Sequence, residues 1–244
     1  MISTAGTKTL IILSLIFSFQ LSAQYITSGK ITYERRTNLE KRFTDQRMRR
    51  MINDENKIRN ESFTLTFNDS ISVFKPVPVE KTDDMMSWMT TKNSYLQNLN
   101  SKRQISILAL FGQDVYVNDS LPVRNWKVTD NKRTIAGYEC RKAIYQKNDS
   151  TRIYAWYSPA LISSVGPEGF CGLPGTILGV ATEDGSVIYF AKKVDVAQPA
   201  SSDLKLEIGK NKVFTLLELR QKLEKEYGNT PWGKRVFDDL FRWL

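Results

Sequence analysis

Short runs in which apolar and polar residues alternate recur about every ten residues through most of this chain, with turn-forming residues between them. Alternation with a period of two is typical of half-buried strands, because successive side chains point to opposite faces. The expected strands cover residues 25–33, 63–67, 71–74, 95–99, 105–111, 115–117, 126–128, 137–145, 152–157, 177–181 and 187–191. The pattern predicts a mainly β (α+β) fold with a single curved antiparallel sheet or partial barrel.

Two helices are expected at the C-terminus, over residues 214–244. Thr215 and Glu218 form a capping box, because each side chain can bond the other residue's amide. The apolar face of this first helix consists of Leu216, Leu219, Leu223 and Tyr227, and Gly228 ends it. Pro231 begins the second helix, whose apolar stripe consists of Trp232, Val236, Leu240 and Trp243, with Phe237 and Phe241 beside it. We expect the stripe to pack on the sheet; a helix that docks onto another protein is the alternative.

Residues 1–23 have the order of a secretory signal peptide: Lys8, then an apolar run over 10–21, then small residues up to Ala23. We place cleavage after Ala23, which leaves a single domain over residues 24–244. The apolar run is too short to cross the roughly 30 Å of a bilayer core, so no transmembrane segment is expected in the mature chain. Gln24 stands where a lipid-anchored protein would need Cys. The predicted location is the periplasm, with the extracellular space as second choice.

The chain is basic, with a net charge of +9. Ten Lys and Arg face five Asp and Glu within residues 30–59, so the excess is concentrated there. A basic face suits lipopolysaccharide phosphates or an acidic partner, and the alternative is a solvated face. No basic stripe is interleaved with aromatic residues that could stack on bases, so no nucleic-acid partner is predicted. Residues 39–58 permit either a helix or a mobile insertion.

The chain contains no His. This excludes Ser-His-Asp and Cys-His catalysis and His-ligated zinc, so no catalytic residue and no cofactor is predicted. Paired carboxylates or a Ser-Lys pair remain for a hydrolase, which is the enzymatic alternative. The carboxylates nearest the motifs described below are Asp130, Glu139, Glu168, Glu183 and Asp184.

Two cysteines, Cys140 and Cys171, are present. An even pair in an oxidising periplasm favours a disulfide, which would contribute about 3 to 4 kcal/mol by restricting the unfolded chain. The alternative is a soft-metal site for Cu(I), helped by Met85, Met86 and Met89. Such a methionine cluster is more often core filler.

A loop dense in turn residues precedes the apolar run at 177–181. Gly172 and Gly175 can adopt positive φ, while Pro174 fixes its own φ and disfavours helix at Leu173, so the loop is expected to be stiff. Loops of this kind often carry function on a rigid scaffold. Its marked residues are Gly166, Pro167, Phe170, Gly172, Leu173, Pro174 and Gly175.

Several motifs occur in one order between residues 115 and 194: Asn125-Trp126, Ile135-Ala136-Gly137-Tyr138-Glu139-Cys140-Arg141-Lys142-Ala143, Ala155-Trp156-Tyr157, Gly166-Pro167 and Gly172-Leu173-Pro174-Gly175. In this the chain resembles the GLPGLI family of Bacteroidota exported proteins, with Thr176 in place of the second Leu of the naming motif. The resemblance implies a cell-envelope setting, often in company with a TonB-dependent outer-membrane transporter. It implies no reaction, because the family has no settled activity.

The expected function is that of an exported, non-catalytic binding or accessory protein that cradles an apolar ligand or peptide. By analogy with periplasmic lipoprotein-carrier half-barrels, the concave face would be lined near Trp126, Tyr138, Ile144 and Trp156 and closed by the loop at 172–175. Trp126, Tyr138, Trp156 and Tyr157 are either ligand contacts or core aromatics that hold register. The alternatives are an interaction subunit of a TonB-dependent transporter, a copper carrier and a carboxylate-based hydrolase.

Overall fold

A computed structural model describes residues 25–43, 45–78, 87–110, 112–148 and 151–230, together with residues 233, 237, 240 and 241. The predicted signal peptide, Met85, Met86 and most of the predicted second C-terminal helix lie outside the described residues.

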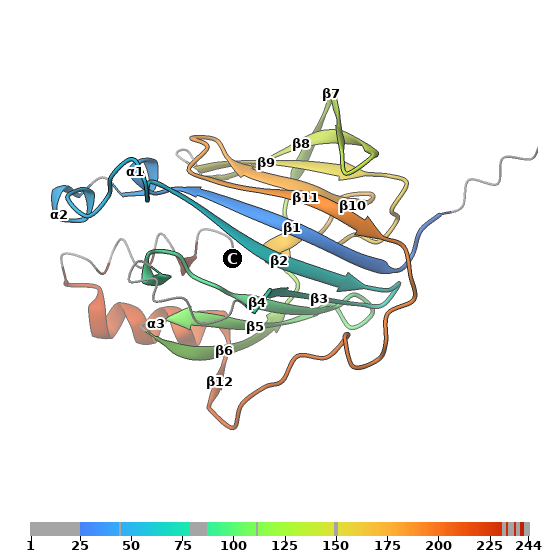
Figure 1. Ribbon diagram of the computed structural model, residues 1–244. Coiled ribbons are helices and arrows are strands. Elements are labelled where there is room, and N and C mark those ends of the chain that lie inside the picture. Colours follow the sequence, from blue (N-terminus) through green and yellow to red (C-terminus); the bar gives the residue numbers. More distant parts are fainter. Residues whose placement is uncertain are drawn as a thin grey trace, which may run out of the picture.

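The described chain forms one sheet of twelve strands, shown in Figure 1. Their order is β12-β6-β5-β4-β3-β2-β1-β11-β10-β9-β8-β7. The strands are β1 (Gly29–Asn38), β2 (Ile58–Phe67), β3 (Ile71–Pro76), β4 (Ser94–Asn98), β5 (Arg103–Leu110), β6 (Gln113–Ser120), β7 (Trp126–Ile135), β8 (Tyr138–Asn148), β9 (Thr151–Ser158), β10 (Thr176–Thr182), β11 (Val187–Asp195) and β12 (Val213–Phe214).

Two meanders make up this sheet. Strands β1 to β6 form one and β7 to β11 the other, and antiparallel pairing of β1 with β11 joins them. Each of the eleven predicted strands is confirmed by an observed one. The sequence did not predict β12, which pairs parallel to β6 and is therefore the exception to the antiparallel arrangement among the described strands.

The basic segment, residues 30–59, lies in a long hairpin of β1 and β2. Two short helices are at the tip of this hairpin, α1 (Leu39–Arg42) and α2 (Gln46–Arg49). Asp45 caps α2, because its carboxylate accepts hydrogen bonds from the amides of Arg47 and Met48. Leu39 and Phe43 are buried with Met89, which lies in the 3₁₀ turn η1 (Ser87–Met89). This small cluster fixes the tip of the hairpin, so the segment is neither one helix nor an unstructured insertion.

Residues 159–175, the motif loop, fill the concave side of the sheet. The loop contains a 3₁₀ turn, η2 (Pro167–Gly169), which contacts β3, β4 and β10. Four strands separate β4 from β10 in the sheet, so the sheet must curve round the turn for both to touch it. Leu161, Val165 and Phe170 are fully buried there. The motif loop is therefore the centre of the hydrophobic core.

The C-terminal helix α3 (Leu216–Tyr227) has the predicted capping box of Thr215 and Glu218. It lies against β6 and β12 and buries Leu219 and Leu223. Its first amide, on Leu216, donates to the Asp119 carboxylate at 2.9 Å, which ties the helix to the end of β6. Among the described helices, none has the length and apolar character needed to cross a bilayer.

Replacing Gly175 with Val should prevent the motif loop from closing. Gly175 has φ of 145°, and a Cβ there would lie 2.2 Å from the Ser158 carbonyl oxygen. We expect a loss of about 3 kcal/mol or more in the free energy of unfolding, measured with urea. Gly137→Ala is the control, because Gly137 also has positive φ (84°) but open space around its Cα. It should cost only about 1 kcal/mol. Equal stability of Gly175→Val and the wild type would contradict the packing described here.

Candidate functional site

Buried polar side chains anchor the motif loop to the first meander and to the segment that links β6 to β7. The carbonyl oxygen of Gly169 accepts hydrogen bonds from Gln97 Nε2 at 2.9 Å and from Arg124 Nη1 at 3.2 Å. Gln97 also donates to Gln104 on β5. The Arg124 guanidinium stacks 4.5 Å from the centre of the Phe170 ring. These contacts satisfy loop groups that would otherwise be buried without partners.

Glu168 lies at the middle of η2 and points into the core. It has φ of 52°, a left-handed conformation uncommon for residues other than glycine, and it is only 1% exposed. The Tyr189 hydroxyl donates a short hydrogen bond to its Oε1. The same oxygen lies 4.0 Å from Arg35 Nη1. A carboxylate from the motif loop thus meets side chains from both meanders.

Arg35 on β1 is the cation of this cluster. Its guanidinium forms a close ion pair with Glu61 on β2, and its Nη1 donates to the Thr91 carbonyl at 2.6 Å. The other oxygen of Glu61 accepts from Thr90 Oγ1 at 2.8 Å. We call Arg35, Glu61, Glu168 and Tyr189 the interior ion cluster. Burial raises the pKa of Glu168, and the nearby Arg35 charge and the Tyr189 hydroxyl oppose that rise.

The predicted concave cradle is wrong in two respects. The motif loop does not close over a cavity at the rim but occupies the concave side itself, with Phe170 fully buried. Trp156 and Ile144 also face the opposite, convex side of the sheet. Trp156 lies between the buried Ala155 and Tyr157, and strand residues alternate in direction. Ile144 pairs with Tyr154, which shares the face of Trp156.

Trp126 does face the concave side, where it supports the motif loop. Its Nε1 donates to the Cys171 carbonyl at 3.0 Å, and its ring lies 6.0 Å from that of Phe170. Tyr157 is 2% exposed and belongs to the core, and Tyr138 packs against the core as a half-buried residue. These three aromatic residues hold the fold together.

The predicted disulfide is also wrong, because both cysteines are free and buried. Cys140 Sγ donates to the carbonyl of Tyr138 on its own strand, whereas Cys171 Sγ donates to the carbonyl of Pro122. Each thiol is therefore held in a separate environment. Burial raises the pKa of Cys140 to about 11 and also raises that of Cys171.

The remaining candidate residues are dispersed. Met89 packs against Leu39 and Phe43, as core filler does. Within the described part of the chain, no group of three or more Cys, Asp or Glu side chains is arranged to hold a metal ion. Glu139 is exposed and pairs with Lys132 at 2.9 Å, and Asp130 is exposed on β7. Glu183 and Asp184 are adjacent to each other, but they are distant in sequence from Asp130 and Glu139 and lie in a different setting.

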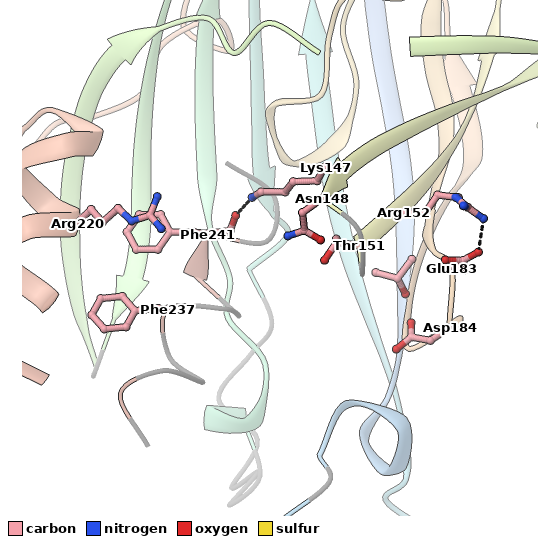
Figure 2. A pocket seen from close by; sticks show the side chains of 10 residues that line it. Lys147, Asn148, Thr151, Arg152, Glu183, Asp184, Arg220, Phe237 and Phe241 are labelled. Atoms are coloured by element: carbon pink, nitrogen blue, oxygen red, sulfur yellow. Dashed lines mark hydrogen bonds and ion pairs between the residues drawn. The ribbon is translucent and has the colours of Figure 1, made fainter. Parts of the chain in front are cut away.

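That setting is an open cleft of about 500 Å³ at one end of the sheet, which we call the end cleft (Figure 2). The adjacent ends of β8 and β9 and the β10–β11 turn supply one side of it, and α3 together with Phe237 and Phe241 supplies the other. Residues on its sheet side are Lys147, Asn148, Thr151, Arg152, Thr182, Glu183 and Asp184, and residues on the other side are Arg220, Phe237 and Phe241.

Aromatic and cationic groups form one side of the end cleft. The rings of Phe237 and Phe241 are nearly parallel, with an angle of 15° and centres 6.2 Å apart. The Arg220 guanidinium lies 5.6 Å from the Phe241 ring centre. Lys147 donates a short hydrogen bond to the Phe241 carbonyl, which ties this segment to β8.

Acidic groups form the opposite side. Glu183 Oε1 accepts from Arg152 Nη1 at 2.7 Å and from the Tyr154 hydroxyl at 3.1 Å. Asp184 lies beside it, and Figure 2 shows both acids across the cleft from Arg220 and the two Phe rings. A stacked guanidinium keeps its N–H edge available for a carboxylate. The cleft can therefore hold a molecule with an anionic end, an apolar middle and a cationic end.

The sequence indicated this site only weakly. Glu183 and Asp184 have the appearance of solvated turn acids, and Phe237 and Phe241 that of packing residues. The spacing of four residues between the two Phe is the available signal, because such residues share one helix face.

No protein-family model matches the chain, and no curated protein matches it. Two solved structures of PNGF-II are similar in fold. One, in space group P21, is 16% identical with a TM-score of 0.52 and the other, in C2, is 17% identical with a TM-score of 0.51. Each match covers 80% of this chain and 32% of PNGF-II, so the chain spans about a third of that protein. An uncharacterized conserved protein from Thermus thermophilus is 8% identical, with a TM-score of 0.41, and the match covers 79% of this chain and 92% of that one.

Replacing Glu168 with Gln should change how stability depends on pH. The folded pKa of Glu168 lies above the ordinary value of 4.5, so the folded protein binds this proton more tightly than the unfolded chain. The contribution of this proton to the free energy of unfolding is complete below pH 4.5 and is lost as the pH rises through the folded pKa of Glu168. Urea unfolding between pH 4.5 and pH 8 should therefore favour the Gln variant over the wild type increasingly as pH rises.

The exposed Glu139 provides the control, because Glu139→Gln should follow the wild-type pH dependence. Parallel curves for Glu168→Gln and the wild type would show that burial does not control the titration of Glu168.

The cysteines should react as free, protected thiols. With a pKa of about 11 for Cys140 and a raised value for Cys171, few thiolates exist at pH 8 and both sulfurs are covered. Brief treatment with N-ethylmaleimide should add nothing to the folded protein and two groups per chain in guanidinium chloride, read by intact mass spectrometry. If the denatured protein could be labelled only after treatment with a reductant, the two cysteines would form a disulfide, which would contradict the structure.

Proposed function

We propose that this chain is an exported, non-catalytic binding protein of the bacterial cell envelope, and that the end cleft holds its ligand. The ligand class is a short peptide, or a peptide end, with an apolar side chain. The signal-peptide pattern of residues 1–23 and the GLPGLI-type motifs support the export and the envelope setting. The periplasm is the proposed location.

One observation carries the proposal: opposite charges face each other across a cleft that also has an aromatic side. A peptide carboxylate would meet the N–H edge of Arg220, an ammonium group would meet Asp184, and an apolar side chain would lie on Phe237 and Phe241. The volume of about 500 Å³ falls in the range of small-molecule sites. Because the motif loop fills the concave side, the ligand site lies at the end of the sheet.

We further propose that the protein belongs to the GLPGLI family and works beside an outer-membrane transporter of the TonB-dependent kind. The motif order along residues 115–194 supports this family assignment. A peptide-binding accessory protein is a role that fits such a neighbour, because the cleft lies open at the surface of the sheet.

Arg220→Gln should weaken binding of the dipeptide alanyl-phenylalanine about tenfold, because it removes a charge-assisted contact to the carboxylate. Isothermal titration calorimetry measures the change. Lys225→Gln is the matched control: it removes one exposed positive charge from the same helix, away from the cleft. It should bind as the wild type does. The same dipeptide with its amine acetylated and its carboxylate amidated should bind less well than the free form.

Equal affinities for Arg220→Gln and the wild type would overturn the assignment of the carboxylate to Arg220. Equal binding of the free and blocked dipeptides would overturn the proposed ligand class.

A further inference from the structure

Half-buried apolar side chains gather on the convex face of the second meander. We call Ile144, Tyr154, Trp156, Ile188 and Phe190 the outer patch. The strand register places its members in two adjacent rows across the sheet. One row runs Lys142, Trp156, Gly179, Phe190 and Glu34, and the next runs Lys127, Ile144, Tyr154, Ala181, Ile188 and Arg36. Residues far apart in sequence thus share one face of the sheet over β8 to β11, the strands in the upper part of Figure 1, and Ile135 of β7 covers the buried Gly179 within that face.

Cations lie directly over the aromatic rings of this patch. Lys142 Nζ is 3.9 Å from the centre of the Tyr154 ring and 5.9 Å from that of Trp156. The Arg133 guanidinium lies 5.0 Å from the Trp156 ring, and Lys192 Nζ lies 5.1 Å from the Phe190 ring. Each ring is therefore paired with a positive charge at distances typical of cation–π contacts.

The charge at the outer patch is strongly one-sided. Five cations lie in or beside the two rows, namely Arg36, Lys127, Arg133, Lys142 and Lys192. Glu34 is the acid within the rows, and Glu183 at the margin is paired with Arg152. This excess of cations over acids favours an acidic partner, because a positive surface attracts negative charge and repels basic proteins.

The form of the patch favours a polypeptide over a lipid surface. Its apolar side chains are half-buried and covered by cations, so they do not protrude as membrane-inserting residues must. Aromatic and arginine side chains on an outer sheet face are typical of the centres of protein interfaces. The adjoining strand β7 is an edge strand of the sheet and is exposed along most of its length. Such an edge suits an extended partner beside the patch.

We infer that the outer patch is a docking surface for an extended acidic segment of a partner protein. The apolar side chains of that segment contact the outer patch, and its Asp and Glu side chains pair with Arg133 and Lys142. The outer patch and the end cleft share no residue, although they adjoin at Glu183, which lines the cleft and accepts a hydrogen bond from Tyr154 of the patch.

The test uses the full-length mature protein and a fluorescein-labelled ten-residue peptide in which glutamate and leucine alternate. Fluorescence anisotropy should show saturable binding that weakens as salt rises. The double variant Arg133→Glu and Lys142→Glu should bind at least tenfold more weakly than the wild type. A second double variant, Lys210→Glu and Lys225→Glu, makes the same change in net charge at exposed positions away from the patch and should bind within twofold of the wild type.

Three results would overturn the inference. These are no saturable binding of the peptide by the wild type, equal weakening in both double variants, or binding of phosphatidylglycerol vesicles in preference to the peptide. The last would assign the patch to anionic lipid. The inference is also independent of the proposed ligand site, because Arg220→Gln should leave anisotropy unchanged while it weakens dipeptide binding.

Discussion

The remaining structure depends on the ion pairs and hydrogen bonds that the buried guanidinium of Arg35 makes inside the sheet. A buried charge without partners costs several kcal/mol, so its neighbours must all be in place. Glu61 comes from β2, Tyr189 from β11 and Glu168 from the motif loop. Both meanders and the loop are thereby required to assemble round one cation. Glu168 enters this cluster from a left-handed backbone position in the middle of the core.

A filled concave side places the recognition surfaces on the outside of the fold. The motif loop occupies the volume that a carrier of apolar ligands would leave open, with Phe170 and Val165 fully buried. The two proposed binding surfaces, the end cleft and the outer patch, differ in shape and charge. The end cleft has facing opposite charges and suits a small ligand, whereas the outer patch is convex and basic and suits a larger partner.

Local patterns account for what the sequence predicted well. Strand alternation and the Thr215 capping box depend on neighbouring residues, so the eleven strands and α3 could be located. The facing of aromatic residues could not, because Trp156 and Tyr157 are consecutive in β9 and must point to opposite sides, and the sequence does not say which side is inner. Glu168 could be picked out only as one of five carboxylates near the motifs, since nothing near it in sequence reveals Arg35. The end cleft escaped prediction because turns and α3, distant in sequence, form it together.

The central position of β1 has a consequence for the order in which the chain can fold. This strand is synthesised first, yet one of its two neighbours is β11, so its edge stays unpaired until residues 187–195 have been made. The first meander alone would expose that edge, and Arg35, although paired with Glu61, would lack its contacts with Glu168 and Tyr189. Cotranslational folding of the two halves as separate units is therefore disfavoured, and the domain depends on late, long-range closure, which makes the nascent chain prone to aggregation until its last long strand arrives.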